Sequence, residues 1–194
     1  MIAPSLSLAA EESIALLYQT LGFHDEAAHA ATSESERRGR LARVTSDVRQ
    51  IQRQATVLRM VSITESFCAR LLLDAAEASV RPATNPIVSI LWDRASVDAT
   101  GTWEAQRDAF KKWFGVTPDW QALDSWATIR NSIAHGLGLL TRRQLQNRTS
   151  TLAKIHRVGV TVADNRLVLT DDDLRNAARA CRDLIVELDA AAPN

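Results

Sequence analysis

The sequence predicts an all-α protein, a helical bundle with one long heptad-patterned helix and a small β-hairpin before the C-terminal helix. Apolar residues recur every three or four positions through most of the chain, which is the periodicity of helices. One such segment runs from about residue 35 to 79, and no glycine or proline interrupts it after Gly39. Only two short stretches near residue 165 alternate with the period of a strand. The 194 residues fit one domain, 1–194.

The N-terminal part should form two short helices followed by the long one. Residues 8–21 are amphipathic, and we expect Gly22 to end that helix. Residues 24–32 are rich in alanine and helical, and their two histidines have no pattern of metal-ligand partners. The long helix carries a seam that steps by three and four. Its members are Leu41, Val44, Val48, Ile51, Ala55, Leu58, Ser62, Glu65, Ala69, Leu72 and Ala76.

Glu65 is an acid on this otherwise apolar seam. A buried carboxylate without a partner is costly, so Glu65 should have one. In one interpretation it lies at the helix edge and forms an ordinary ion pair with an arginine. In the other it is held near Arg130 to position that guanidinium.

The middle of the chain is interrupted by turn residues. Residues 81–86 form a proline-containing loop, and residues 87–93 a helical turn. Residues 102–114 form a helix closed by Gly115, and its aromatic stripe is typical of a core. We expect the next helix to start with Thr117 as its cap and Pro118 as its first residue.

The C-terminal part begins with a polar, basic and partly helical stretch, residues 142–157. Residues 159–162 and 166–169 form a hairpin around Asp164 and Asn165. Thr170 and the acids after it, up to Asp173, are typical of a helix N-terminus. The last helix should bury seven apolar residues: Leu174, Ala177, Ala178, Cys181, Leu184, Ile185 and Leu188.

Composition excludes several classes of protein. Basic and acidic residues number 23 each, so net charge does not indicate nucleic-acid binding. Cys68 and Cys181 are too few and too far apart for a disulfide scaffold or a metal site, and are typical of buried free thiols. No apolar run is long enough for a membrane span, and the first residues do not resemble a signal peptide. We therefore expect a cytoplasmic protein that does not bind membranes.

The distribution of charge is uneven even though the total is balanced. Residues 1–36 contain six acids and no lysine or arginine, whereas residues 125–163 contain no acid. The basic residues of that second segment are Arg130, Arg142, Arg143, Arg148, Lys154 and Arg157. A phosphate backbone would need such a region, although a solvated basic face is the alternative. The asymmetry also raises the hypothesis that the acidic segment covers the basic one.

The helix that we expect to begin at Pro118 and to be stopped by Gly136 carries the residues best suited to chemistry. Its polar row comprises Asp124, Thr128, Asn131 and His135, and the row lies beside the apolar face. Asn131 and His135 are four residues apart and therefore neighbours on one face, with Arg130 beside them. Gly136 and Gly138 are the residues expected just past a helix C-terminus.

The segment Arg130-Asn131-Ser-Ile-Ala-His135 resembles the motif of the HEPN superfamily, an all-helical group rich in RNA-cleaving toxins. That motif is an arginine followed after four to six residues by a histidine, often with a polar residue after the arginine. The resemblance covers roughly residues 41–190, the core bundle, and leaves residues 1–36 as an acidic helical extension. It implies a metal-independent endoribonuclease without a cofactor. Such proteins often have an acid at the place of Glu65, so the resemblance favours the interpretation in which Glu65 positions Arg130.

The residue types suit the cleavage that this resemblance implies. His135 can exchange a proton with the 2′-hydroxyl or the leaving oxygen, and Arg130 can hold charge on the phosphoryl oxygens. Asn131 can orient either the imidazole or the phosphate, and Arg142, Arg143, Arg148 and Lys154 are the expected RNA contacts. Five residues of helix separate Arg130 and His135 by about 140°. We therefore expect a composite site at the interface of a homodimer.

Two other interpretations remain open. The chain can be a HEPN-like module that binds RNA, nucleotide or protein without cleaving it. It can also be a helical dimer in which Arg130 only pairs with Glu65 and His135 only caps its helix. If it is a nuclease, the resemblance suggests the toxin of a toxin–antitoxin or phage-defence system, with a cognate antitoxin as a possible partner.

Overall fold

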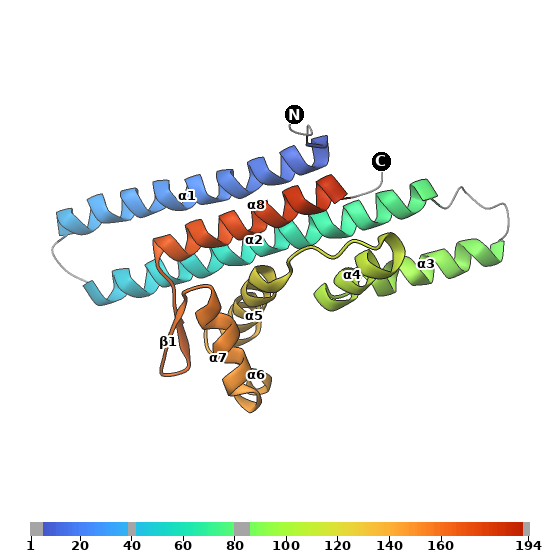
Figure 1. Ribbon diagram of the computed structural model, residues 1–194. Coiled ribbons are helices and arrows are strands. Elements are labelled where there is room, and N and C mark those ends of the chain that lie inside the picture. The colour runs from blue at the N-terminus through green and yellow to red at the C-terminus, as the bar shows by residue number, and fades with distance from the viewer. Residues whose placement is uncertain (1–5, 39–41, 80–85, 192–194) are drawn as a thin grey trace.

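The protein is an all-α bundle with one small hairpin, as predicted (Figure 1). The computed structural model describes residues 6–38, 42–79 and 86–191. Its elements, in chain order, are α1 (Leu8–Arg38), α2 (Ala42–Ser79), α3 (Pro86–Thr100), α4 (Trp103–Ala109), the π-helix η1 (Phe110–Phe114), α5 (Gln121–Gly136), α6 (Arg142–Gln146), α7 (Arg148–Arg157), β1 (Thr161–Ala163), β2 (Arg166–Val168) and α8 (Asp171–Ala191). None of the helices in these parts of the chain combines the length and apolarity that a membrane crossing requires.

Three long helices, α1, α2 and α8, each pack against the other two, and the shorter elements pack beside this bundle. α1, α2 and α8 lie side by side along their lengths (Figure 1). α5 packs against α2 and α8, and α7 packs against α5. α3 and α4 follow the far end of α2, while the hairpin joins α7 to α8 (Figure 1). α5 therefore lies between α2 on one side and α7 on the other.

The predicted buried face of α8 is confirmed. All seven expected apolar residues, from Leu174 to Leu188, are buried, and they form one core with residues from α1, α2 and α5. Trp126 on α5 is fully buried in the same core, as is Leu17 on α1. Cys68 and Cys181 are free, buried thiols, as expected, and burial raises the pKa of Cys181 to about 12.

The predicted seam of α2 is wrong between Val48 and Leu58, while its first member, Leu41, lies outside the described residues. Ile51 is 64% exposed, Val48 and Ala55 are also exposed, and Leu58 is only partly buried. The buried residues of α2 are Gln54, Thr56, Val57, Met60, Val61, Thr64, Phe67, Cys68, Leu72, Ala75 and Ala76, and only Leu72 and Ala76 among them belong to the predicted seam. α2 packs against α1, α8 and α5 at once, so the positions of these neighbours decide which part of its surface is covered. Spacing alone does not carry that information.

Three predicted helix boundaries are also wrong. Gly22 does not end a helix: it lies inside α1, which continues to Arg38 because residues on both sides of the glycine, Leu17 and His24, are buried on one face. α3 is a full helix of 15 residues and not a single turn. α5 starts at Gln121, whose N–H donates to Asp119 Oδ1 at 2.9 Å, and not at Pro118. Most of the predicted loop at 81–86 lies outside the described residues.

The predicted turns near the C-terminus are confirmed. β1 and β2 pair antiparallel, and Asp164 and Asn165 between them both have positive φ, as a tight two-residue hairpin requires. Thr170 caps α8: its hydroxyl accepts from the Asp173 N–H, and the Asp173 carboxylate accepts from the Thr170 N–H at 2.7 Å. This is the reciprocal capping box that the acids after Thr170 suggested.

Asp171, the first residue of α8, ties the three long helices together. Its carboxylate accepts from Arg53 Nε at 2.7 Å and from Arg49 Nη2 at 3.0 Å, both on α2. It also lies 3.3 Å from Nε2 of the buried His24 on α1. The hydrogen bond from Arg53 is the main cause that holds the pKa of Asp171 well below its ordinary value. His24 thus has a structural partner, and no metal is needed to explain its burial.

Candidate functional site

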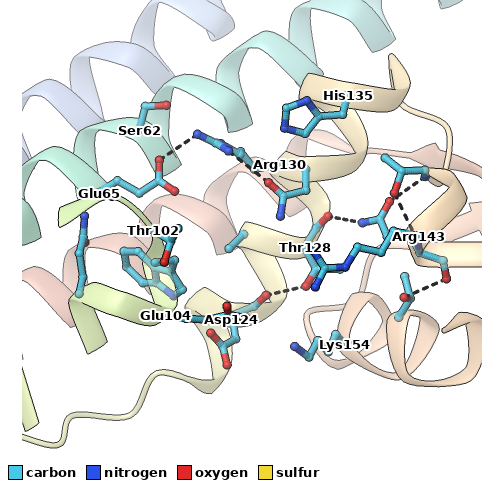
Figure 2. A pocket seen from close by; sticks show the side chains of 18 of the residues that line it. Ser62, Glu65, Thr102, Glu104, Asp124, Thr128, Arg130, His135, Arg143 and Lys154 are labelled. Carbon is cyan, nitrogen blue, oxygen red and sulfur yellow. Dashed lines mark hydrogen bonds and ion pairs between the residues drawn. The ribbon is translucent and has the colours of Figure 1, made fainter. Parts of the chain in front are cut away.

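A cavity of about 1070 Å³ lies between α2, the α3–α4 junction, α5, α6 and α7. Six helices contribute residues to its wall, and α5 runs through the middle (Figure 2). The whole polar row predicted on α5 lines this cavity: Asp124, Thr128, Asn131 and His135. The apolar residues Leu123, Trp126 and Ile133 of the same helix are buried in the core instead. One helix therefore uses its two faces for packing and for the cavity.

Arg130 lies at the centre of the predicted constellation. Its Nη2 donates to Glu65 Oε2 on α2 at 3.2 Å, and its Nη1 donates to Asn131 Oδ1 at 3.1 Å (Figure 2). Its Nε is buried and has no partner among the described residues. The guanidinium is thus held by two groups, and its side chain remains 30% exposed at the cavity.

Glu65 has the partner that its position on α2 required. Its side chain is 23% exposed, so it lies at the edge of the core and not inside it. Burial raises the pKa of Glu65 above its ordinary value, and the Arg130 guanidinium opposes that rise. Both sequence interpretations contain this ion pair.

His135 lines the same cavity from the C-terminal end of α5 (Figure 2). Its side chain is exposed, and within the described part of the chain no hydrogen bond or ion pair holds it. The left-handed residue that ends the helix is Leu137, with φ of 51°, and Gly138 follows with φ of 86°. Gly136, which was expected beyond the helix, is its last residue.

The turn after His135 is fixed by the hairpin and by α2. Leu167 N–H donates to the Gly138 carbonyl, and Leu140 N–H donates to the Asn165 carbonyl, each at 2.8 Å. A Cβ at Gly138 would collide with the Gln54 side chain on α2. Through these contacts the hairpin holds the end of α5, and with it the backbone of His135, against the bundle.

Gln144 fastens α6 to α5 on the opposite wall of the cavity. Its Oε1 accepts from Thr141 N–H at 2.8 Å and from the Ser132 hydroxyl at 3.0 Å. Its Nε2 donates to the Thr128 carbonyl at 2.8 Å. Thr141 and Gln144 form a capping box that starts α6, a signal present in the sequence that we did not use.

The four predicted RNA contacts divide into two pairs. Arg143 and Lys154 line the cavity, from α6 and α7 (Figure 2). Arg142 and Arg148 are exposed but are not part of its wall. The cavity also contains two acids besides Glu65: Glu104, and Asp124, which accepts from Arg107 at 3.3 Å. The wall is therefore mixed in charge, which the acid-free stretch of sequence did not indicate.

Sequence reasoning missed the wall supplied by the α3–α4 junction. Thr100, Thr102, Trp103 and Gln106 line the cavity there. Nothing in their spacing relates them to Arg130, because the fold alone brings α4 next to α2 and α5. The described part of the acidic N-terminal segment packs on α2 and α8, and none of it lines the cavity, so it does not cover the cations of the cavity wall in this structure.

No group of three or more histidine, cysteine or acidic side chains among the described residues is arranged to hold a metal ion. Comparison of the chain with protein-family models, with curated proteins and with solved structures found no match.

Proposed function

We propose that this protein is a metal-independent endoribonuclease of HEPN type, in which RNA bound in the cavity is cut next to Arg130 and His135. One observation carries the proposal. A single open cavity is lined by all four residues that the sequence singled out: Arg130, Asn131 and His135 of the short motif, and Glu65, the acid on the apolar seam. Arg143 and Lys154 line it too, so the phosphate groups of an RNA strand would meet cations there.

The chemistry uses the ribose of the substrate as the nucleophile. The 2′-oxygen attacks the adjacent phosphorus, its proton passes to a base, and the bond from phosphorus to the 5′-oxygen breaks. The leaving oxygen takes up a proton, which gives a 2′,3′-cyclic phosphate and a 5′-hydroxyl. His135 acts as the base or the acid in this step. Arg130 donates to the phosphoryl oxygens as their charge grows, while Glu65 and Asn131 hold its guanidinium in place.

One imidazole cannot be base and acid at the same instant, so a second copy of the chain is part of the proposal. Asn131 and His135 are both exposed, and a two-fold axis beside them would bring a second Arg130 and His135 to the same phosphate. Light scattering of the active protein should give the mass of a homodimer. A monomer with full activity would refute the composite site.

The central test is cleavage of total RNA by the purified protein in excess EDTA. The wild type should cut RNA and leave cyclic-phosphate ends, and His135→Ala should not. His156→Ala is the matched control, because His156 is an exposed histidine on α7 that does not line the cavity, and it should cut normally. Cleavage by His135→Ala at the wild-type rate would refute the proposed role of His135.

The biological role follows from the HEPN resemblance. We place the protein in the cytoplasm as the toxin of a toxin–antitoxin or phage-defence system, neutralised by a cognate antitoxin. Expression of the wild type should stop growth of a bacterial host, and Arg130→Ala should relieve the arrest. Equal growth with both proteins at equal levels would contradict a toxin.

A non-catalytic binding module is the second candidate, and one feature of the site favours it. Arg130 is already paired with Glu65, and no described residue orients His135 as a catalytic base usually requires. In this case neither the wild type nor His135→Ala would cut RNA, and both would bind it equally well.

A further inference from the structure

Three buried side-chain polar atoms in the described residues have no hydrogen-bond partner, and all three belong to residues that line the cavity between α2, α4 and α5. They are Trp103 Nε1, Gln106 Oε1 and Arg130 Nε. Buried polar groups are nearly always paired, because an unpaired one loses its bonds to water and gains nothing in return. Because all three belong to residues around one cavity, they are the groups that a ligand in this cavity would satisfy.

Trp103 and Gln106 offer complementary groups at the α3–α4 end of the cavity. The indole N–H can only donate, and the amide oxygen can only accept. Gln106 is 4% exposed, and its Nε2 donates to the Thr100 carbonyl at 3.4 Å, the long end of the range for a hydrogen bond. The amide can therefore turn toward a ligand at little cost. The Trp103 ring packs edge-on against Trp120 with centroids 5.2 Å apart, which keeps the indole in place.

The charge of the side chains that line the cavity differs between its two ends. Figure 2 shows Thr102 and the acids Glu65 and Glu104 at one end and the cations Arg143 and Lys154 at the other, with Arg130 on the helix between them. A nucleotide has the same polarity, an uncharged base with donors and acceptors at one end and an anionic phosphate at the other. A cavity of about 1070 Å³ also exceeds the usual size of a site for one small molecule.

We propose that the α3–α4 end of the cavity binds one unpaired RNA base, which accepts a hydrogen bond from Trp103 Nε1 and donates one to Gln106 Oε1. The inference rests on the proposed function, whose substrate it defines as single-stranded RNA. A base inside a duplex uses its donor and acceptor edge for pairing and cannot present it here. Base recognition at this wall and phosphate binding by Arg143 and Lys154 would place the linking phosphate beside Arg130.

The test compares ligands that differ only in the base. The probes are the four nucleoside 5′-monophosphates and ribose 5-phosphate, titrated into the wild type by calorimetry. At least one nucleotide should bind ten times more tightly than ribose 5-phosphate, and Gln106→Leu should reduce that ratio about tenfold. Affinity for ribose 5-phosphate should stay unchanged in the variant. Lys154→Ala is the matched control, since it should weaken all five ligands and leave the ratio unaltered.

Gln106 is buried, so folding of its variant is checked by circular dichroism, and Trp103→Phe provides a second variant that keeps a ring and removes the N–H. Equal binding of the nucleotides and ribose 5-phosphate by the wild type, or an unchanged ratio in both folded variants, would overturn the base site. RNA cleavage is measured separately. RNA cleavage without a base preference in binding would refute the base site but not the proposed catalysis. A base preference in binding without RNA cleavage would refute the catalysis but not the base site.

Discussion

The Arg130 guanidinium donates from Nη2 to Glu65 Oε2 at 3.2 Å, joining two residues that are 65 positions apart in the chain. The bond crosses from α5 to α2 at the edge of the cavity, where both side chains are partly exposed. A guanidinium holds its N–H donors in a fixed planar arrangement. The hydrogen bonds to Glu65 and to Asn131 therefore also set the direction of the remaining N–H groups of Arg130.

If Glu65 positions Arg130, the variant Glu65→Gln should lower kcat for RNA cleavage about tenfold and leave KM nearly unchanged. The neutral amide keeps the shape but holds the guanidinium less firmly. Asp74→Asn is the control, because Asp74 forms an exposed pair with Arg70 on the same helix, outside the cavity wall. An unchanged kcat in Glu65→Gln would leave Glu65 a structural partner only.

The same pair predicts a pH dependence of activity. Burial raises the pKa of Glu65 above 4.5, and the protonated acid holds Arg130 less strongly. Activity should therefore fall as the pH drops through that raised pKa, and the fall should be absent in Glu65→Gln. Identical acidic limbs in the pH–rate profiles of the wild type and Glu65→Gln would contradict this assignment.

Lys154 should bind a phosphate of the RNA backbone because it lines the cavity. Lys154→Ala should weaken RNA binding similarly for all sequences and reduce the slope of log affinity against log salt by about 0.7. Arg148→Ala, outside the cavity wall, should change the slope less. The measurement is fluorescence anisotropy of a labelled single-stranded RNA over a range of salt. Equal changes in both variants would indicate a diffuse basic surface.

Two glycines should respond in opposite ways to alanine. Gly138 has φ of 86°, and an added Cβ would collide with Gln54, so Gly138→Ala should destabilise the fold by about 2 kcal/mol. Gly22 lies inside α1 with open space around it, so Gly22→Ala should stabilise by about 0.5–1 kcal/mol. Urea unfolding measures both. Destabilisation by Gly22→Ala would contradict the continuous α1.

Asp171 should contribute stability that disappears in acid. Its pKa is lowered in the fold, so the contribution is present above the ordinary value of 3.8 and is lost as the pH falls toward the folded pKa. Asp171→Asn should lower stability at neutral pH by about 1 kcal/mol, a modest figure because the side chain is partly exposed. The difference in Tm between Asp171→Asn and the wild type should become smaller as the pH falls below 3.8. Asp172→Asn, whose carboxylate is 88% exposed, is the matched control and should have little effect.

Local chemistry was sufficient to predict much of this protein. The face of α8, the hairpin at Asp164 and Asn165, and the cap at Thr170 follow from the order of neighbouring residues, because their hydrogen bonds span only a few positions. The polar row of α5 was predictable for the same reason, since helical spacing alone places Asn131 beside His135.

Only the tertiary structure decided which surfaces meet. The buried face of α2 depends on three neighbouring helices, so spacing misplaced it at Ile51, and the continuation of α1 past Gly22 depends on burial of Leu17 and His24. The same holds for the site. Glu65 could be singled out as an anomaly, but Trp103 and Gln106 carry no local signal that relates them to Arg130. Contacts between distant segments arise from packing of whole helices, which no short stretch of sequence encodes.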